Sequence, residues 1–308
     1  MKALVGVDGS SGAFGAVRFA GRLLSGSHDQ VALYYTPPEM RHPSGSDAGA
    51  EVIDRARQAL AEAVFAEARA RLPRELAERA HTIVGAKHPR QGILLAADQW
   101  RAEIVVLGAR GSGPIHGLAL GSVANAVAHA ARIPTLIVRH ADQPPHQPAL
   151  RVLLAHDGSQ ASDQAASFLG RLHWPAESAG RILTVVESLH PGTVPEWLEQ
   201  RVRDAAAEAM AQAWLKEHEA DKQTKLAELT QCCQQLPPPF QREPPLVVEG
   251  HAAEEILRAI EEQQIDLVVL GTHGRGMLER LLLLGSTSDK VLSQSPCSVL
   301  LVPEHEQP

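Results

Sequence analysis

The segment AEIVVLGARGSG, residues 102–113, decides the fold of this chain. Its apolar run, residues 104–107, does not alternate with polar residues, which is typical of a strand buried on both faces of a parallel sheet. The run ends in Gly108, and the Gly-x-x-Gly turn that begins there favours exposed backbone. A second copy, IDLVVLGTHGRG at residues 265–276, has the same pattern. The sequence therefore predicts an α/β architecture built from two similar units.

Three further landmarks recur in both units in the same order, which indicates a tandem duplication. A strand ending in Asp-Gly-Ser precedes the central strand, and a Gly-Ser pair and a proline-headed apolar strand follow it. The first unit has KALVGVDGS (2–10), Gly121-Ser122 and PTLIVR (134–139), and the second has RVLLAHDGS (151–159), Gly285-Ser286 and PCSVLLV (296–302).

These landmarks predict a first domain at residues 1–140 and a second at residues 151–303. The segment between them, ADQPPHQPAL at 141–150, is rich in proline and reads as a stiff linker. The second domain has a longer helical region at 196–236, and its pattern is compatible with one long helix or a broken pair.

Strands alternate with helical patterns inside each unit, as in doubly wound sheets with helices on both faces. In the first unit the expected strands are 2–7, 30–35, 80–84, 103–108 and 134–139, and the expected helices are 12–25, 48–71, 89–99 and 122–131.

Composition excludes several classes of protein. The chain has 308 residues, 44% of them apolar, and a net charge of -7. The negative charge disfavours a nucleic-acid partner, and 4% aromatic residues leave few stacking platforms for single strands. No apolar run approaches the length of a membrane span, and no signal peptide is visible, so we expect a cytoplasmic protein without a membrane partner. Three cysteines predict neither a disulfide framework nor a zinc site.

The candidate ligand site lies where strand order reverses, beyond the carboxyl ends of the strands. Asp8 closes the first strand, and the loop from Gly108 to Gly111 can form a nest of backbone N–H groups. Ser122 begins the next helix, whose free N–H groups attract phosphate. Two such phosphate sites suit a polyphosphate. The alternatives are that Gly-Ser is only a helix cap, and that the aspartate only belongs to an Asp-Gly turn.

Known catalytic motifs are missing from the sequence. No Gly-Lys dipeptide occurs, so there is no Walker A loop, and the glycines after the first strand do not have dinucleotide-binding spacing. His116 is the nearest candidate base in the first glycine loop, and an isolated loop histidine is usually just exposed. Cys232 and Cys233 lie in a helical pattern. We therefore identify no catalytic residue and no metal-ligating cluster.

The glycine pattern resembles that of the universal stress protein family. Nucleotide-binding members of that family have Gly-x2-Gly-x9-Gly-[Ser/Thr], and the first unit matches it fully with Gly108, Gly111, Gly121 and Ser122. The second unit has ten residues in place of nine before Gly285. The extra residue could displace the Gly-Ser pair from the phosphates or bulge out harmlessly.

The resemblance implies a five-stranded parallel sheet in each domain, with helices on both faces, and binding of ATP, with Mg²⁺ or Mn²⁺ bridging the phosphates. Tyr35 could stack on adenine or fill the pocket, and Arg110 could neutralise phosphate or face solvent. In the first unit the implied site residues are Asp8, Tyr35, Leu107, Gly108, Gly111, Gly121, Ser122 and Val123. In the second they are Asp157, Val185, Leu270, Gly271, Gly274, Gly285, Ser286 and Thr287, with Val185 matching the position of Tyr35 after the second strand.

The resulting hypothesis is a stress-response or regulatory protein that binds adenine nucleotide in one or both units. The alternatives are a protein-interaction scaffold of the same fold with empty pockets, and a slow adenine-nucleotide hydrolase. Because family members pair through the last strand, the resemblance also implies that the two units pair within one chain, with a homodimer as a further possibility.

Overall fold

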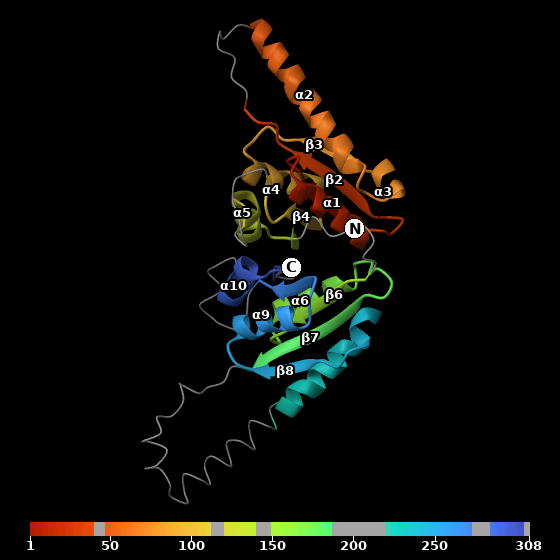
Figure 1. The fold of residues 1–308 in the computed structure, drawn as a ribbon, viewed down its shortest axis with the longest axis vertical. Coiled ribbons are helices and arrows are strands. Elements are labelled where there is room, and N and C mark those ends of the chain that lie inside the picture. The colour runs from red at the N-terminus through yellow and green to blue at the C-terminus, as the bar shows by residue number, and fades with distance from the viewer. Residues whose placement is uncertain are drawn as a thin grey trace, which may run out of the picture.

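The computed structural model contains two units, which lie one above the other in Figure 1. It describes residues 1–39, 47–111, 120–139, 149–186, 220, 222–272 and 284–304. Most of the expected linker and most of the 196–236 region lie outside these residues. In the part that is described, residues 222–235 are helical.

The first unit has the expected alternation of strands and helices. One element was not expected from the sequence: α3, a helix of five residues after Pro73, is too short for a helical period to be recognised. The elements are β1 (Lys2–Gly6), α1 (Ser11–Leu23), β2 (Gln30–Tyr35), α2 (Asp47–Arg69), α3 (Arg74–Glu78), β3 (His81–Val84), α4 (Pro89–Trp100), β4 (Ile104–Gly108), α5 (Ser122–Ala130) and β5 (Thr135–Val138).

The second unit has the same order, with the helix at 222–235 in the place of α2. A short 3-10 helix, η1, then leads into the edge strand. The elements are β6 (Arg151–Ala155), α6 (Gln160–Leu169), β7 (Ala179–Val186), η1 (Pro238–Gln241), β8 (Leu246–Glu249), α9 (Ala252–Glu262), β9 (Leu267–Gly271), α10 (Ser286–Gln294) and β10 (Ser298–Val302).

All strands of the described residues form one sheet, in the order β3-β2-β1-β4-β5-β10-β9-β6-β7-β8. Neighbouring strands are parallel except β5 and β10, which are antiparallel. The chain runs outward from β1 through β2 and β3 and then crosses to β4, so strand order reverses between β1 and β4. The equivalent reversal in the second unit lies between β6 and β9. Both reversals are where the sequence placed the ligand sites.

The buried residues form two apolar layers, one on each face of the sheet. One layer lies under α1, α2, α6 and the helix at 222–235. The other lies under α4, α5, α9 and α10. The residues of β4 and β9 contribute to both layers with alternate side chains, which explains why their sequences are apolar without a period of two.

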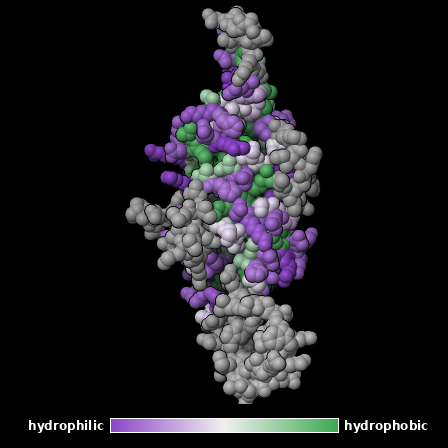
Figure 2. Space-filling model, turned by 90° about the vertical axis from the view of Figure 1, so that its left-hand side faces the viewer, coloured by the Kyte–Doolittle hydropathy of each residue, from purple (hydrophilic) through white to green (hydrophobic). Residues whose placement is uncertain are grey.

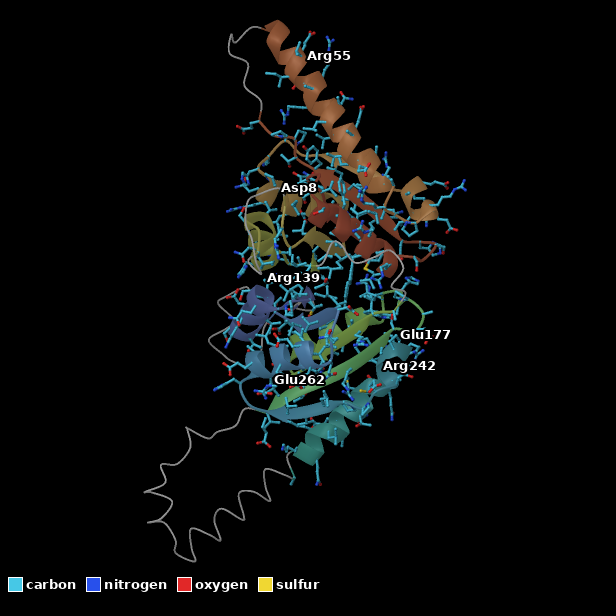
Figure 3. All side chains as sticks on the ribbon, in the orientation of Figure 1. Asp8, Arg55, Arg139, Glu177, Arg242 and Glu262 are labelled. Carbon is cyan, nitrogen blue, oxygen red and sulfur yellow. The ribbon has the colours of Figure 1, made fainter. Side chains whose placement is uncertain are left out.

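The units are joined by antiparallel pairing of β5 with β10, in which Leu136 lies opposite Leu300. Arg139 follows β5 and is buried at this junction, which Figure 3 shows between the two halves. Its guanidinium donates to the carbonyl of Leu292 at 2.9 Å. Nearby, His129 of α5 lies 3.0 Å from the carboxylate of Asp289 on α10. This is the intramolecular pairing that the family resemblance implied.

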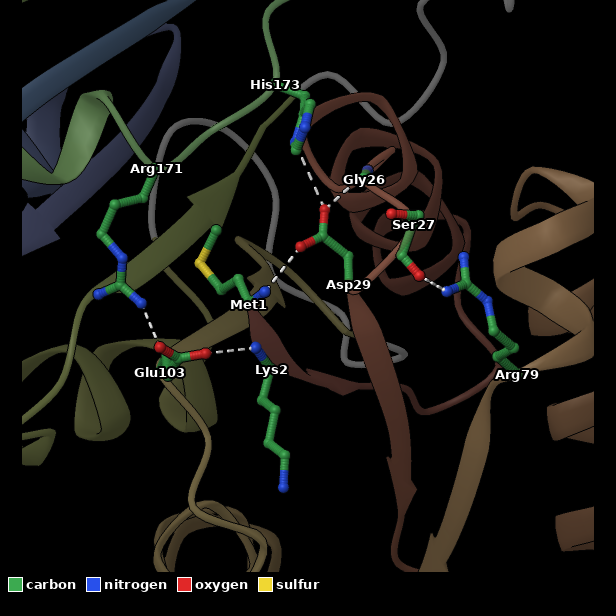
Figure 4. A network of polar contacts seen from close by, with 9 residues as sticks. All are labelled: Met1, Lys2, Gly26, Ser27, Asp29, Arg79, Glu103, Arg171 and His173. Carbon is green, nitrogen blue, oxygen red and sulfur yellow. Dashed lines mark hydrogen bonds and ion pairs between the residues drawn. The ribbon is translucent and has the colours of Figure 1, made fainter.

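A second set of contacts ties the units together at the amino ends of the strands (Figure 4). Glu103 accepts a hydrogen bond from the Lys2 amide at 2.7 Å and pairs with Arg171 of the second unit. Asp29 lies 3.4 Å from the ring of His173, also of the second unit. The two units are therefore held at both the β5–β10 seam and this polar network.

The described surface carries no extended apolar face. Figure 2 shows hydrophobic residues scattered among hydrophilic ones. The large exposed apolar side chains are Val52 and Leu60 on α2, Val84 on β3, Leu95 on α4 and Leu226 on the helix at 222–235. None of the described helices combines the length and hydropathy that a bilayer crossing requires.

The polar network predicts a specific pH dependence. Burial alone would raise the pKa of Glu103, but the Lys2 amide and the Arg171 cation outweigh it and hold that pKa below its usual value of 4.5. A lowered carboxylate pKa stabilises the folded chain above about pH 4.5, and the contribution is lost as the pH falls through the folded pKa. Glu103→Gln should therefore cost stability at neutral pH, by about 1 kcal/mol or less for an exposed pair.

Urea unfolding of the wild type and of Glu103→Gln from neutral to acidic pH measures this difference. The difference in unfolding free energy between the two proteins should narrow below about pH 4.5. Glu262→Gln, on the exposed side of α9, is the control and should match the wild type throughout. A Glu103→Gln deficit that stays constant as the pH falls would contradict the assignment.

Candidate functional site

The carboxyl end of β1 is shaped by a tight turn and a helix cap. Gly9 has a positive φ of 83°, which glycine adopts readily. Ser10 caps α1, since its hydroxyl accepts a hydrogen bond from the Ala13 amide at 3.1 Å. Asp8 Oδ1 in turn accepts from the Ser10 amide at 3.0 Å and the Ser10 hydroxyl at 2.6 Å. Asp8 thus braces the cap, and its exposed side chain also lies at the reversal point (Figure 3).

Glycine is needed at two positions of the motif for different structural reasons. A Cβ on Gly108 would lie 2.6 Å from backbone atoms of Gly12, so glycine is required where β4 meets α1. A Cβ on Gly111 would lie 2.3 Å from Asp8 Oδ2. The close contact at Gly108 brings the glycine loop to the first strand, and the space at Gly111 admits the carboxylate of Asp8. Two sequence landmarks about a hundred residues apart therefore form one wall.

Helix α5 begins at this wall with uncapped amides. Its cap residue is Gly121, which has no side chain to offer, and the first helical hydrogen bond is from Asn125 to Gly121 at 2.9 Å. The amides of residues 122–124 consequently lack an intrahelical acceptor. The Gly121 amide donates to the Ala109 carbonyl at 2.8 Å, which holds the start of the helix against the glycine loop.

These elements enclose a cavity of about 470 Å³ at the reversal between β1 and β4. Every site residue expected in the first unit lines it, together with Arg110 and with residues that the sequence did not single out. The expected ones are Asp8, Tyr35, Leu107, Gly108, Gly111, Gly121, Ser122 and Val123, and the others are Gly6, Val7, Ala13, Tyr34, Thr36, Pro38, Pro89, Ile93, Arg110 and Ala124.

Two neighbouring tyrosines line the cavity from β2, on opposite faces of the sheet. Tyr35 packs edge to face on Phe65 of α2, with ring centroids 6.3 Å apart, so its ring is engaged with the protein. Burial, with the negative charge of Asp8, raises the pKa of Tyr35. Tyr34 belongs to the layer under α4, and its hydroxyl accepts from Thr36 at 2.9 Å. Tyr34 belongs to no sequence motif. Only its register opposite Gly6 of β1 could have indicated that it lines the cavity.

Arg110 lines the cavity and is exposed. Its charge also acts on the junction between the units. Burial, with the nearby charge of Arg110, lowers the pKa of Arg139. The cavity of the first unit and the seam between the units therefore lie close enough to interact electrostatically.

In the second unit, the strand register corrects one expected correspondence. Gly6 lies opposite Tyr34, and the equivalent Ala155 lies opposite Leu183. The counterpart of Tyr35 is therefore Thr184, and Val185 corresponds to Thr36. A shift of one residue changes the face of the sheet, and Val185 indeed packs in the layer under α9 and α10. Short apolar strands without a marker residue can be aligned in either register by sequence alone.

The extra residue of the second glycine motif leaves the helix start in place. The Gly285 amide donates to the Thr272 carbonyl, as the Gly121 amide does to the Ala109 carbonyl. The φ and ψ angles of Gly285, -71° and 157°, resemble those of Gly121, -64° and 150°. The Gly-Ser pair therefore lies at the strand end in both units.

The other expected residues of the second unit lie around the same reversal point. Gly271 repeats the role of Gly108, since its Cβ would lie 2.7 Å from the backbone of Ala161 on α6. Leu270 is buried, and Ser286 and Thr287 begin α10. Asp157 follows β6, and Gly274 lies outside the described residues.

Asp157 braces a helix cap as Asp8 does. Its Oδ1 accepts from the Ser159 amide at 2.9 Å. Desolvation would raise the pKa of Asp157, but hydrogen bonds from Ser159 and Ser162 outweigh it and lower that pKa. The carboxylate is thereby kept ionised at the second reversal point.

Comparison with known proteins agrees with this architecture. The sequence profile of the universal stress protein family matches residues 1–139 and 149–303. A universal stress protein of Mycolicibacterium smegmatis is 28% identical over 97% of this chain and 96% of its own length. One of Thermus aquaticus, "Universal stress protein in QAH/OAS sulfhydrylase 3'region", is 32% identical over 49% of this chain and 96% of its own.

A universal stress protein structure from Archaeoglobus fulgidus has the same fold. It superposes with a TM-score of 0.61 at 19% identity and covers 99% of this chain and 98% of its own. The profile matches both halves of the chain, and the relative from M. smegmatis extends over nearly all of it. This chain therefore belongs to the universal stress protein family and carries two of its domains in tandem.

Proposed function

We propose that this protein binds ATP in the cavity of its first unit and acts as a stress-response or regulatory binding protein. The observation that carries the proposal is the start of α5. Uncapped amides, a glycine cap residue and the Ser122 hydroxyl meet a cavity that the Asp8 carboxylate also lines. Backbone amides at a helix start bind phosphate, and a carboxylate accepts hydrogen bonds from ribose hydroxyls.

Gly121 supports the presence of a ligand because the protein itself does not require glycine there. Its φ is -64°, which any residue adopts, and a Cβ would meet its nearest neighbour, the Ala109 carbonyl, at 3.4 Å. Gly108, in contrast, would clash with backbone. A glycine that lines a cavity without a packing reason leaves room for a ligand to approach the main chain.

The volume and the lining also suit a nucleotide. About 470 Å³ lies in the range of small-molecule pockets. Leu107, Ile93 and Tyr34 provide an apolar wall for a base, and Arg110 is the one lysine or arginine among the described lining residues. The described residues contain no cluster of three potential metal ligands. A Mg²⁺ or Mn²⁺ ion would therefore be held by phosphate oxygens and water, with the Ser122 hydroxyl available to it.

We favour a binding role over phosphoryl transfer, because catalysis requires a positioned base and cations aimed at the γ-phosphate. The described lining supplies Asp8, which is engaged with Ser10, and Arg110. The proposal includes a cytoplasmic location, with which three free cysteines agree.

Ligand binding can be tested by the stabilisation that it confers. Saturating Mg-ATP should raise the melting temperature of the wild type by several degrees, because a ligand that binds only the folded state stabilises it. Mass spectrometry of ligand released from freshly purified protein provides a second readout. Asp8→Asn should reduce the shift, and Asp98→Asn, on the exposed face of α4, should retain it. A wild type that carries no adenine nucleotide and shows no shift would refute the proposal.

Two glycine variants separate ligand binding from folding. Gly121→Ala should cost about 1 kcal/mol of stability or less, because alanine is a poorer helix cap residue than glycine. It should weaken ATP binding by about tenfold or more, since the new methyl group occupies space at the phosphates. Gly108→Ala should destabilise the protein by about 1–3 kcal/mol, because the methyl group meets backbone. Calorimetric titration and urea unfolding measure the two effects. Wild-type ATP affinity in Gly121→Ala would place the phosphates elsewhere.

A further inference from the structure

Another hollow lies in the second unit, at the carboxyl end of β6 and on the face of the sheet that α6 covers. Its volume is about 260 Å³. The described residues that line it come from the end of β6, from α6, from β7 and from the helix at 222–235, and none comes from α9 or α10. They are His156, Asp157, Gly158, Asp163, Thr184, Lys225, Glu228, Leu229 and Cys232.

In the first unit the equivalent positions carry apolar or aromatic side chains, two of which, Val7 and Tyr35, also line its cavity. His156 corresponds to Val7, since their amides donate to the carbonyls of Leu183 and Tyr34, respectively. Asp163 corresponds to Phe14 at the same position of the first helix, and Thr184 corresponds to Tyr35 by strand register. In the first unit, Val7 and Tyr35 lie in the apolar layer, and Phe14 packs against it.

The three polar residues of the second unit are connected to one another. His156 Nε2 lies 2.9 Å from Asp163 Oδ1, and the Thr184 hydroxyl donates to the His156 carbonyl. His156 is only 9% exposed, yet its second ring nitrogen, Nδ1, has no hydrogen-bond partner in the described part of the chain. With Asp163 accepting from Nε2–H, the neutral ring presents Nδ1 as an acceptor. An acceptor that lines a hollow in this way is available to a donor from a ligand or water.

A positively charged and a negatively charged side chain line the same hollow. Lys225 and Glu228 both lie on the helix at 222–235 and line it, and neither has an ion-pair partner among the described residues. Lys222 on the same helix does have one, Glu249. A ligand here can therefore meet an ammonium group and a carboxylate that the protein has not already neutralised.

We propose that this hollow, the His156 pocket, binds a small zwitterion of the free amino acid class. The ligand's ammonium group donates to His156 Nδ1 and to the Glu228 carboxylate, and its carboxylate accepts from the Lys225 ammonium. Leu229 and Cys232 provide apolar contact for a short side chain. The pocket is smaller than the usual range for drug-sized ligands, which suits a molecule of about ten heavy atoms. The proposal does not depend on ATP binding in the first unit.

Saturation-transfer NMR of the full-length protein with a mixture of the proteinogenic L-amino acids is the first test. At least one amino acid should receive saturation, and calorimetric titration then measures its affinity. Ethylamine and propionate, which carry one charge each, should bind at least about tenfold more weakly. No saturation of any amino acid would overturn the proposal, as would equal binding of either single-charge probe.

Variants then locate the site. Glu228→Gln and Lys225→Met should each weaken binding of the identified amino acid by about tenfold or more. Thr184→Tyr, which introduces the residue of the first unit, should abolish it by filling the hollow. Glu262→Gln is the control and should bind as the wild type does. Glu228 is exposed and Lys225 is half-buried, so changes at these positions leave the core intact. If Glu228→Gln and Lys225→Met both bind the amino acid with wild-type affinity, the site is refuted, even if Thr184→Tyr fails to fold.

The ATP-dependent shift in melting temperature, measured on the same variants, distinguishes amino acid binding in the second unit from ATP binding in the first. It should be the same in Glu228→Gln as in the wild type, because Glu228 lies on another unit and another face. Loss of amino acid binding with an intact ATP shift supports the His156 pocket. A loss of both in Glu228→Gln would contradict a separate site.

Discussion

The close backbone contact between the end of the fourth strand and the start of the first helix organises each unit. In the first unit it joins Gly108 to Gly12, and in the second it joins Gly271 to Ala161. A side chain at either strand position would meet main-chain atoms and separate the strand from the helix. Because the helix follows directly from the strand-one aspartate, this contact brings the glycine loop to that carboxylate. The cavity exists because a helix and a strand approach more closely than side chains normally allow.

Duplication has produced two units with the same frame and different pockets. Among the described residues, the glycine that ends the central strand, the braced helix cap and the start of the helix after the glycine loop are alike in both units. The side chains packed around the first helix have diverged, with an apolar cluster at Tyr35 and a polar one at Thr184. Such divergence is compatible with the fold because backbone pairing does not depend on these side chains: Tyr35 is paired with Val84 and Thr184 with Val247 at the same place in each sheet half.

Sequence reasoning succeeded where a local feature has one structural meaning. Unbroken apolar runs identified the buried strands, and each expected site residue of the first unit lines one cavity. It failed where several local patterns look alike. Val185 was aligned with Tyr35 because a short apolar strand contains no marker of register, and α3 is shorter than a helical period. Tyr34 and Ile93 were missed because an apolar residue that faces a cavity has the same pattern as one that faces the core.

Local sequence patterns were sufficient to predict the duplicated α/β frame, the order of elements and the glycine positions, because periodicity and backbone freedom are properties of a few adjacent residues. Which residues meet across the chain could be read only from the three-dimensional arrangement. The pairing of β5 with β10, the burial of Arg139 at the seam and the gathering of His156, Asp163 and Thr184 around one hollow each join distant segments. Such contacts depend on register, on the direction of pairing and on packed volume, none of which has a signature within a single segment.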